Sequence, residues 1–475
     1  MKKSLLFFLI TGFSFKSFSQ DSANNFYTLK QCVETAIANN ADVKNFQFQM
    51  LSNKVTWQQA KGNMLPFISG NISHGINQGR SIDPFTNGYI NQSVNFADYS
   101  LSASINLWNG LSIQNNIKSN SLNYQASQMD LQQEKDNITI NVILAYLQVL
   151  SNTELLKQAM QQAEVTRKQA ERLTVLNNEG AIAPATLYDM KGQLGNDELN
   201  VVNAKNSLET AKLTLAQLMN IAYSSSMQLE NISGNEPSSI YEATPEQIFQ
   251  QASQQLAIVK AADLRKLSTN KAVKSAHGQL LPSLFLNGGL FTNYSSAATL
   301  SQLINTTDVA TDNYILLNND KFAVYAPQNN YSSQKISYGN QWKNNFNSSV
   351  SIGLQIPLLN GLQAKSRVSQ AKINEEKAIF QSSTVRIQLK QSIEQAYVNM
   401  TAAYERYQTL TSQVQDFTQS FRAAEVRFNE GALTSVDYMI AKNNVDRANI
   451  NLISAKYDYI LRTKILDYYK GKLLL

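Results

Sequence analysis

The chain has 475 residues, a formal net charge of +6, only 16% charged residues and a single cysteine. One cysteine excludes an internal disulfide, and the two histidines, His74 and His277, lack acidic or cysteine neighbours at metal-ligand spacing. No P-loop, dinucleotide-binding glycine pattern or nucleophile elbow occurs, so we expect no enzyme activity and no cofactor.

The chain opens with an apolar segment typical of a secretory signal. Met1-Lys2-Lys3 precedes an apolar run and then small polar residues up to Gln20, so we assign residues 1–20 to a cleaved signal peptide. Removal of its three lysines lowers the net charge to about +3, which gives no indication of a nucleic-acid partner. Beyond the signal, no run of about 18 apolar residues predicts a transmembrane helix.

The mature chain is predicted to contain two copies of one unit, at residues 21–243 and 244–475. Asn178-Glu179-Gly180 recurs as Asn429-Glu430-Gly431, and Ala145-Tyr146 recurs as Ala396-Tyr397, with one offset of 251 residues (from 180 to 431). Each copy begins with helical sequence, roughly 28–62 and 244–278. That sequence ends before a proline, Pro66 or Pro282.

Polar–apolar alternation after each proline predicts a pair of strands in each copy. The pairs lie at about 66–78 with 98–108, and at about 282–294 with 346–358. Their polar positions are uncharged serine, asparagine and glycine, which is typical of a membrane strand with a wet inner face, although a soluble sheet can show the same pattern. Loops rich in asparagine, glycine and serine, at 79–97 and 295–345, are expected to lie in solvent.

Two long helical hairpins are predicted at 111–220 and 362–469. The first outgoing arm repeats apolar residues every seventh position: Val142, Val149, Leu156, Ala163 and Ala170. Such a repeat keeps one seam of a helix against a partner helix. At each tip, a glycine that can adopt a left-handed conformation is expected to end the outgoing helix.

Four strands cannot close a barrel by themselves. An open sheet edge in lipid leaves backbone groups without hydrogen-bond partners, at a cost of several kcal/mol each. Several chains must therefore contribute strands to one wall. Two chains would give eight strands with a filled bore, and three would give twelve strands with a passage.

Several stretches resemble the TolC-type outer-membrane efflux proteins (the outer-membrane factor family), including Bacteroidetes-like members. Residues 27–32 with 36–40 resemble the mature start of these proteins, and residues 79–84 resemble their first loop. Leu107-Trp108-Asn109-Gly110 and Leu358-Leu359-Asn360-Gly361 are similar to the joins between strand and helix in the family. Residues 427–431, running on to Val436-Asp437, resemble its second periplasmic tip.

The resemblance implies a mainly helical fold with transmembrane strands. Three chains would form a twelve-stranded β-barrel in the outer membrane, continuous with a twelve-helix α-barrel that extends into the periplasm. The implied function is the exit duct of a tripartite efflux or type I secretion system. The implied partners are two further copies of the chain, outer-membrane lipid, a periplasmic adaptor (membrane fusion) protein and an inner-membrane pump of the RND, ABC or MFS class.

The resemblance also implies roles for residues at the tips of the hairpins. The residues expected to contact the adaptor are Glu179, Gly180, Ala181, Arg427, Glu430, Gly431 and Ala432. Asp437 falls where the family has an inward carboxylate that constricts the tunnel, and Asp189 is a second gate candidate. Each has an alternative: Thr434-x-x-Asp437 also reads as a helix-capping box, and Asp189 as part of a solvated helix face.

The sequence departs from the family at the second tip. Leu433 stands where the best-known member has an arginine that links the closed helices, so a closed state held by that ion pair is not expected. An alternative function is a periplasmic or secreted coiled-coil scaffold or adhesin without a pore. It explains the heptads but leaves the alternating strands without a purpose.

Overall fold

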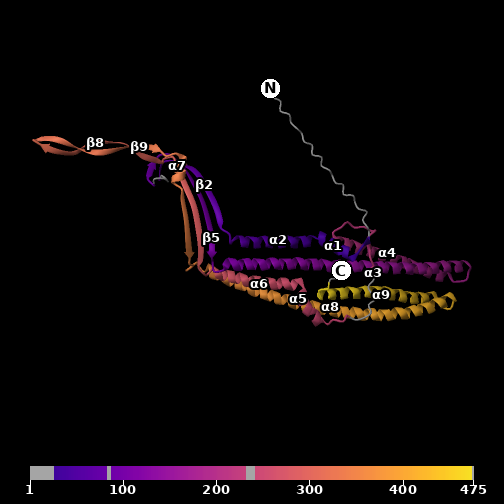
Figure 1. The fold of residues 1–475 in the computed structure, drawn as a ribbon. Coiled ribbons are helices and arrows are strands. Elements are labelled where there is room, and N and C mark those ends of the chain that lie inside the picture. The colour runs from indigo at the N-terminus through magenta and orange to yellow at the C-terminus, as the bar shows by residue number, and fades with distance from the viewer. Residues whose placement is uncertain (1–25, 83–86, 232–240, 473–475) are drawn as a thin grey trace, which may run out of the picture. The chain divides into compact units, whose positions relative to one another are not determined.

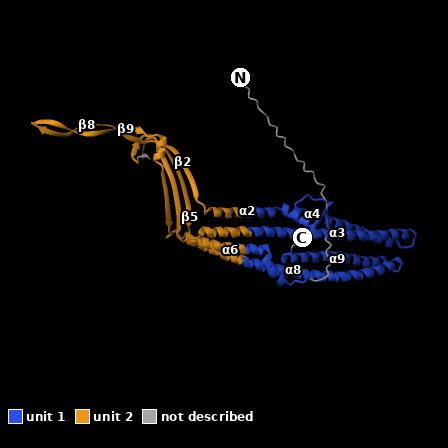
Figure 2. Cartoon of the chain, viewed as in Figure 1, with its two compact units in different colours: residues 1–50, 127–262, 382–475 blue, residues 51–126, 263–381 orange. Residues whose placement is uncertain are grey.

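The computed structural model describes residues 26–82, 87–231 and 241–472. The described chain forms two compact units, residues 1–50, 127–262 and 382–475, and residues 51–126 and 263–381 (Figure 2). The expected signal peptide, residues 1–20, lies outside the described residues. None of the described helices is long and apolar enough to cross a membrane.

Each copy begins with a short helix followed by a longer one. The first copy has α1 (Leu29–Asn39) and α2 (Ala41–Gly62), and the second has α5 (Pro245–Gln255) and α6 (Ala257–Gly278). Capping boxes of the same kind, Thr28 with Gln31 and Thr244 with Gln247, fix the start of α1 and of α5. The predicted helical stretches therefore form, each with one break after its first eleven helical residues.

The long hairpins consist of α3 (Ser112–Asn178) with α4 (Pro184–Met219), and α8 (Gln363–Asn429) with α9 (Ser435–Tyr469) (Figure 1). The two outgoing helices have 67 residues each, or roughly 100 Å at 1.5 Å per residue. In the helical unit, α1 packs on the first hairpin through Cys32, Val142 and Leu215, and α5 packs on the second through Ile248, Ile393 and Leu466. The heptad positions supply these buried contacts.

Burial explains the state of the single cysteine. Cys32 is fully buried in this core, and desolvation raises the pKa of its thiol to about 12. A thiol that is buried among apolar side chains stays protonated, so Cys32 is expected to be chemically unreactive.

The four predicted strands form one antiparallel sheet. They are β2 (Phe67–Asn77), β5 (Val94–Trp108), β7 (Ser283–Ser295) and β10 (Asn347–Gln355), in the order β10-β7-β5-β2. The two copies therefore meet between β5 and β7. The outer strands, β10 and β2, pair with no further strand among the described residues.

The joins between strand and helix are alike in the two copies. Gly110 and Leu111 both have positive φ values, 63° and 61°, and Gly361 and Leu362 have 61° and 63°. A leucine seldom adopts such a backbone conformation, so the reversal is imposed by the flanking strand and helix. The Asn-Gly-Leu sequence thus marks the same sharp turn twice.

The prediction that residues 295–345 form a loop is wrong. This segment contains β8 (Thr299–Leu317) and β9 (Asp320–Lys335), paired only with each other, and α7 (Tyr338–Asn344). Its asparagine and threonine residues sit in strands that also carry apolar residues, and Asn318-Asn319, with φ of 53° and 73°, makes the hairpin turn. The shorter segment 79–97 also contains two short strands, β3 (Arg80–Ile82) and β4 (Tyr89–Asn91).

Candidate functional site: a two-faced sheet and the helical tips

One face of the four-stranded sheet, which we call the apolar face, is aliphatic. Directly paired residues in adjacent strands share a face, and the pairs on this face include Ile72 with Tyr99, and Leu286 with both Ile105 and Ile352. Its outer strands are the most exposed: Val350 is 81% and Ile72 74% exposed, whereas Ile105 and Leu286 on the inner strands are partly buried. Exposed aliphatic side chains on a sheet face suit contact with lipid.

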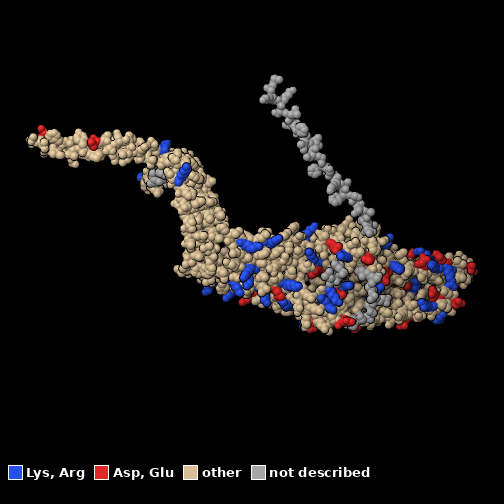
Figure 3. Space-filling view, viewed as in Figure 1, with Lys and Arg blue, Asp and Glu red and all other residues tan. Residues whose placement is uncertain are grey.

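The opposite face, which we call the polar face, carries serine, asparagine and glycine. The Ser69 and Ser102 hydroxyls lie 2.9 Å apart across β2 and β5, and the Ser73 hydroxyl donates to Asp98 at 3.3 Å. Asp98 is the only acidic residue in the four strands, which contain no lysine or arginine. In Figure 3 almost no charge is visible over these strands.

Two glycines on the polar face accommodate phenylalanine rings. A Cβ at Gly353 would overlap the Phe285 ring on the neighbouring strand, and a Cβ at Gly75 would lie 2.7 Å from the Phe96 ring. Each ring therefore lies close against the glycine on the neighbouring strand. A residue with a side chain at either position would clash with the ring, so both positions require glycine.

Aromatic residues from both copies meet at the loop end of the sheet. The Tyr99 ring packs edge-on against Trp342 with centroids 4.6 Å apart, and the Tyr99 hydroxyl hydrogen-bonds to that of Tyr338. Trp342 and Tyr338 belong to α7, not to a strand, so helix α7 supplies part of this aromatic cluster. Aromatic side chains at this level of a membrane strand are typical of the lipid–water interface.

The tips of the two hairpins have the same backbone geometry. Gly180 and Gly431 have φ values of 75° and 72°, and Ala181 N–H and Ala432 N–H donate to carbonyls five residues earlier, Leu176 and Arg427, both at 2.8 Å. This is the Schellman arrangement that ends a helix at a left-handed glycine. All seven predicted tip residues are exposed: Glu179, Gly180, Ala181, Arg427, Glu430, Gly431 and Ala432.

The two gate candidates lie beside the start of α9. The Thr434 hydroxyl accepts a hydrogen bond from the Asp437 backbone N–H at 3.1 Å and donates to the Asp437 carboxylate at 2.8 Å. Asp437 therefore does take part in capping α9. The Ser435 hydroxyl donates to Asp189 at 3.1 Å, so the carboxylate on α4 reaches the first turn of α9. Both aspartates are exposed.

The family model for "Outer membrane efflux protein" matches residues 32–220 and 248–467, which include both hairpins and all four sheet strands. The chain belongs to the outer membrane efflux protein family. The predicted resemblance to TolC-type efflux proteins and the mainly helical fold with strands are thereby confirmed. This efflux protein is an outer-membrane channel of the kind used by tripartite systems, with a long periplasmic helical part, and its family is not a family of enzymes.

Individual relatives agree with the family assignment. The efflux protein is 22% identical to outer membrane protein TolC of Escherichia coli (strain K12) over 401 residues, 79% of this chain and 70% of TolC. Its fold resembles the CmeC outer membrane channel of Campylobacter jejuni, with a TM-score of 0.70 and 17% identity over 94% of this chain and 86% of that one. A membrane protein from Pseudomonas aeruginosa gives a TM-score of 0.72 and 13% identity, over 93% and 92%.

An arginine that the sequence did not reveal joins the two tips of the efflux protein. The Arg172 guanidinium, on α3, donates to the Asn429 backbone carbonyl at 3.0 Å and to the Asn429 side-chain oxygen. Its position in the second copy, 251 residues later, is Ala423, so the repeat did not single it out. Arg172 therefore contributes a polar contact between the two hairpins close to Leu433.

Leu433 itself packs in an apolar cluster shared by both hairpins. Leu173 and Met190 from the first hairpin, and Phe428 and Tyr438 from the second, form its buried centre. The Phe428 and Tyr438 rings stack with centroids 4.5 Å apart. Behind the exposed tips, the two hairpins are therefore joined by apolar packing.

A buried ion cluster joins the same hairpins further along α4 and α9. The Lys442 ammonium, 2% exposed as a side chain, lies 2.9 Å from the Asp197 carboxylate and 2.6 Å from that of Asp446. Thr166 on α3 donates to Asp197 at 2.5 Å, and Gln193 donates to it at 2.8 Å. Burial raises the pKa of Asp446, and the nearby Lys442 opposes this shift.

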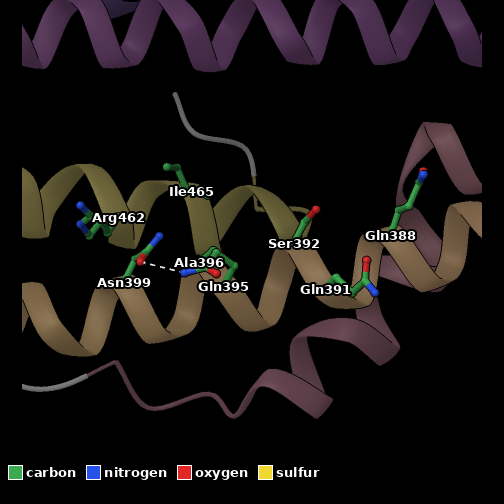
Figure 4. A pocket seen from close by; sticks show the side chains of 8 residues that line it. All are labelled: Gln388, Gln391, Ser392, Gln395, Ala396, Asn399, Arg462 and Ile465. Atoms are coloured by element: carbon green, nitrogen blue, oxygen red, sulfur yellow. Dashed lines mark hydrogen bonds between the residues drawn. The ribbon is translucent and has the colours of Figure 1, made fainter.

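A polar groove runs between α8 and α9 (Figure 4). It has a volume of about 700 Å³ and is lined mainly by uncharged side chains: Gln388, Gln391, Ser392, Gln395, Ala396, Asn399, Arg462 and Ile465. Arg462 is paired with Asp458 at 3.0 Å. Side-chain amides of this kind both donate and accept hydrogen bonds, so the groove is suited to hold water.

Among the described residues, no group of three or more histidine, cysteine, aspartate or glutamate side chains is placed to hold a metal ion. His74 lies in β2 and His277 near the end of α6.

Proposed function

We propose that three copies of this efflux protein assemble into one exit duct, with a twelve-stranded barrel in the outer membrane and a twelve-helix tunnel in the periplasm. The observation that carries this proposal is the four-stranded sheet, which has one apolar face, one polar face and two outer strands without a partner among the described residues. Such a sheet in lipid needs strands from other chains at both edges.

We infer three subunits, and not two, from the width that the interior of the barrel must have. A barrel of eight strands is filled by its own side chains, whereas larger barrels enclose a cavity or a channel. Since β2 and β10 run antiparallel to their neighbours, β10 of one subunit can pair with β2 of the next and continue the pattern. Family members of the TolC type are trimeric, which supports the same number.

The tips are proposed to bind a periplasmic adaptor protein, which in turn joins the duct to an inner-membrane pump of the RND, ABC or MFS class. The exposed turns around Gly180 and Gly431 have the same backbone shape and are the parts of the helical unit furthest along each hairpin. Two similar turns per subunit give six similar docking points per trimer. The pump supplies the energy and selects the substrate.

The periplasmic gate is proposed to include Asp437 and Asp189. Both carboxylates lie beside the start of α9. The Asp437 carboxylate is part of the cap of this helix, and the Asp189 carboxylate, on α4, accepts a hydrogen bond from Ser435. Facing copies of these carboxylates in a trimer would repel one another and favour cations. Arg172 and the apolar cluster around Phe428 hold the two hairpins together against that repulsion.

The assembly can be tested on protein extracted from outer membranes with detergent. Its mass, corrected for detergent, should equal three chains, and planar lipid bilayers containing it should conduct ions. A monomer, or a trimer without conductance under any applied voltage, would contradict the proposed duct. Release of the protein by osmotic shock without detergent would instead favour the scaffold interpretation.

The gate can be tested in the same bilayers. Asp437→Ala and Asp189→Ala are expected to change the conductance and lower the preference for cations. Thr434→Ala is the control, because it removes the hydroxyl of the cap and leaves both carboxylates. If Thr434→Ala reproduces the effect of Asp437→Ala, then Asp437 acts only through the helix end.

A further inference from the structure

The β8–β9 hairpin is held firmly at its base. The Gln341 side chain, 1% exposed, donates to the Ser295 and Ile336 carbonyls, each at 2.9 Å, and accepts from the Ser295 N–H at 2.8 Å. The Ile336 N–H also donates to the Ala298 carbonyl at 3.0 Å. The two arms therefore leave the sheet unit from a fixed point at the loop end of the sheet.

Beyond this base the hairpin makes no pairing except between its own arms. Among the described residues, β8 and β9 form a separate two-stranded sheet. A two-stranded hairpin by itself is marginally stable in water. Its outer edges also present unpaired backbone groups, which proteins usually protect with charges, and β8 and β9 together contain only five charged residues, Asp308, Asp312, Asp320, Lys321 and Lys335.

The outer end of the hairpin, residues 314–325, is apolar on both faces, and we call it the distal segment. Tyr314 pairs with Ala323, and Ile315 pairs with Phe322, so neighbouring pairs alternate between the two faces. One face carries Tyr314, Leu316 and Tyr325, and the other carries Ile315, Leu317 and Phe322. All six side chains are between 52% and 63% exposed.

We propose that the distal segments of the three subunits pack against one another beyond the outer mouth of the channel. This proposal rests on the trimer proposed above. In a three-fold ring each hairpin meets one neighbour with one face and the other neighbour with the opposite face. Apolar residues on both faces fit that arrangement, whereas a single docked partner would cover only one face.

The barrel makes such packing favourable because it holds the three hairpin bases close together. Tethered segments meet at effective concentrations of about millimolar, so even weak apolar contacts form. Pro327 lacks a backbone N–H, so the edge of β9 cannot pair continuously with a strand of another hairpin. We therefore assign the contact between hairpins to side chains of the distal segment and not to backbone hydrogen bonds. The charged residues that would oppose it are few: in the distal segment only Asp320 and Lys321 carry a charge, and their signs are opposite.

Cysteine cross-linking tests the proposal in intact cells. Cys32 is the only cysteine and is buried, so Cys32→Ala gives a thiol-free channel. In that background, Ile315→Cys with Tyr325→Cys places one thiol on each face of the distal segment. Because each face meets a different neighbour, mild oxidation is expected to give covalent trimers, about tenfold more than the control.

The matched control carries Ile315→Cys alone, because its thiol then faces the opposite, thiol-free face of the neighbouring hairpin. Every variant is first checked for mass as a trimer in detergent. Trimers that give no cross-link above the control would overturn the packing and leave the duct intact. Cross-links to a different protein would also overturn it, and failure of the parent protein to form trimers would overturn the duct itself.

Discussion

The ammonium of Lys442, on α9, lies 2.9 Å from the carboxylate of Asp197, on α4, and both side chains are almost fully buried. This pair joins the second hairpin to the first. Asp446 lies 2.6 Å from the same ammonium, and Gln193 connects the cluster to Asn443 at 3.2 Å. The two hairpins of one subunit thus share a polar contact as well as the apolar one nearer the tips.

Lys442→Met should destabilise the channel strongly. The substitution leaves Asp197 buried without its cation, and removing one partner of a buried pair typically costs about 3–5 kcal/mol. Guanidinium unfolding of the purified channel in detergent measures the loss. Lys456→Met is the control, because the Lys456–Glu154 pair is at 3.7 Å and partly exposed, so its loss should cost at most about 1 kcal/mol. Equal losses in the two variants would contradict a role for the buried cluster.

Asp446→Asn should change how stability depends on pH. Burial raises the pKa of Asp446 in the folded protein, so the folded state binds this proton more tightly than the unfolded state. The parent channel should therefore gain stability from this group as the pH falls through the folded pKa towards the unfolded value of about 3.9. The asparagine variant should lack that gain. Melting curves at pH 4 to 7 on both proteins make the comparison, and parallel curves would contradict it.

Arg172→Ala should loosen the contact between the tips. The guanidinium donates to both the backbone carbonyl and the side-chain oxygen of Asn429. Its loss leaves the apolar cluster and the Ser435–Asp189 hydrogen bond to hold the hairpins together near the tips. We expect more frequent open events in bilayer recordings. Arg167→Ala is the matched control, because Arg167 pairs with Glu198 inside the first hairpin at 3.0 Å. An unchanged open probability in Arg172→Ala would exclude this contact from the gate.

Gly431→Val should disturb the second tip. The backbone there has a φ of 72°, which costs a β-branched residue about 1–2 kcal/mol or more. We expect the variant to remain in the outer membrane and to lose efflux activity, because the shape of the exposed turn changes. Gly195→Ala, inside α4 with open space around it, should leave efflux unchanged. Normal efflux in Gly431→Val would show that the turn shape is not needed.

Gly353→Ala should impair the sheet. The added Cβ would overlap the Phe285 ring, so the ring or the strand must move, at a cost of about 1–3 kcal/mol. Gly288→Ala is a close control in the same sheet, since its Cβ would meet nothing nearer than the Ser349 carbonyl at 3.9 Å. The yield of folded channel in outer membranes measures the effect. Similar yields for the two variants would contradict the packing of Phe285 on Gly353.

The regular elements could be predicted because their signals are local. Strand β2 begins and ends within one residue of the predicted range, whereas β5 begins at Val94, four residues earlier than expected. The alternation of Tyr99, Leu101 and Ala103 with serines predicted which side chains share a face. The prediction for segment 295–345 failed because its asparagine and serine content favours a loop by composition, while the strand pairing is visible only across the turn.

The candidate site was predictable only in part. The left-handed glycines at the tips follow from Asn-Glu-Gly and its repeat, because glycine is the residue that most readily adopts a positive φ at the end of a helix. Lys442, Asp197 and Arg172 gave no comparable signal, since each is a charged residue on a long polar helix and looks like a solvated face. Their roles depend on which residue of the other hairpin lies opposite.

The duplication, the long helices, the four alternating strands and the family could all be inferred from the amino-acid sequence. The helices and strands depend on periodicity and turn residues, which act over a few residues at a time, and the duplication and the family show as recurring motifs along the chain. Three findings required the folded chain: β8 and β9 form a hairpin, Lys442 is buried between two carboxylates, and Arg172 reaches Asn429. They required it because hydrogen bonds and ion pairs depend on distances of about 3 Å between residues remote in the chain, and packing sets those distances.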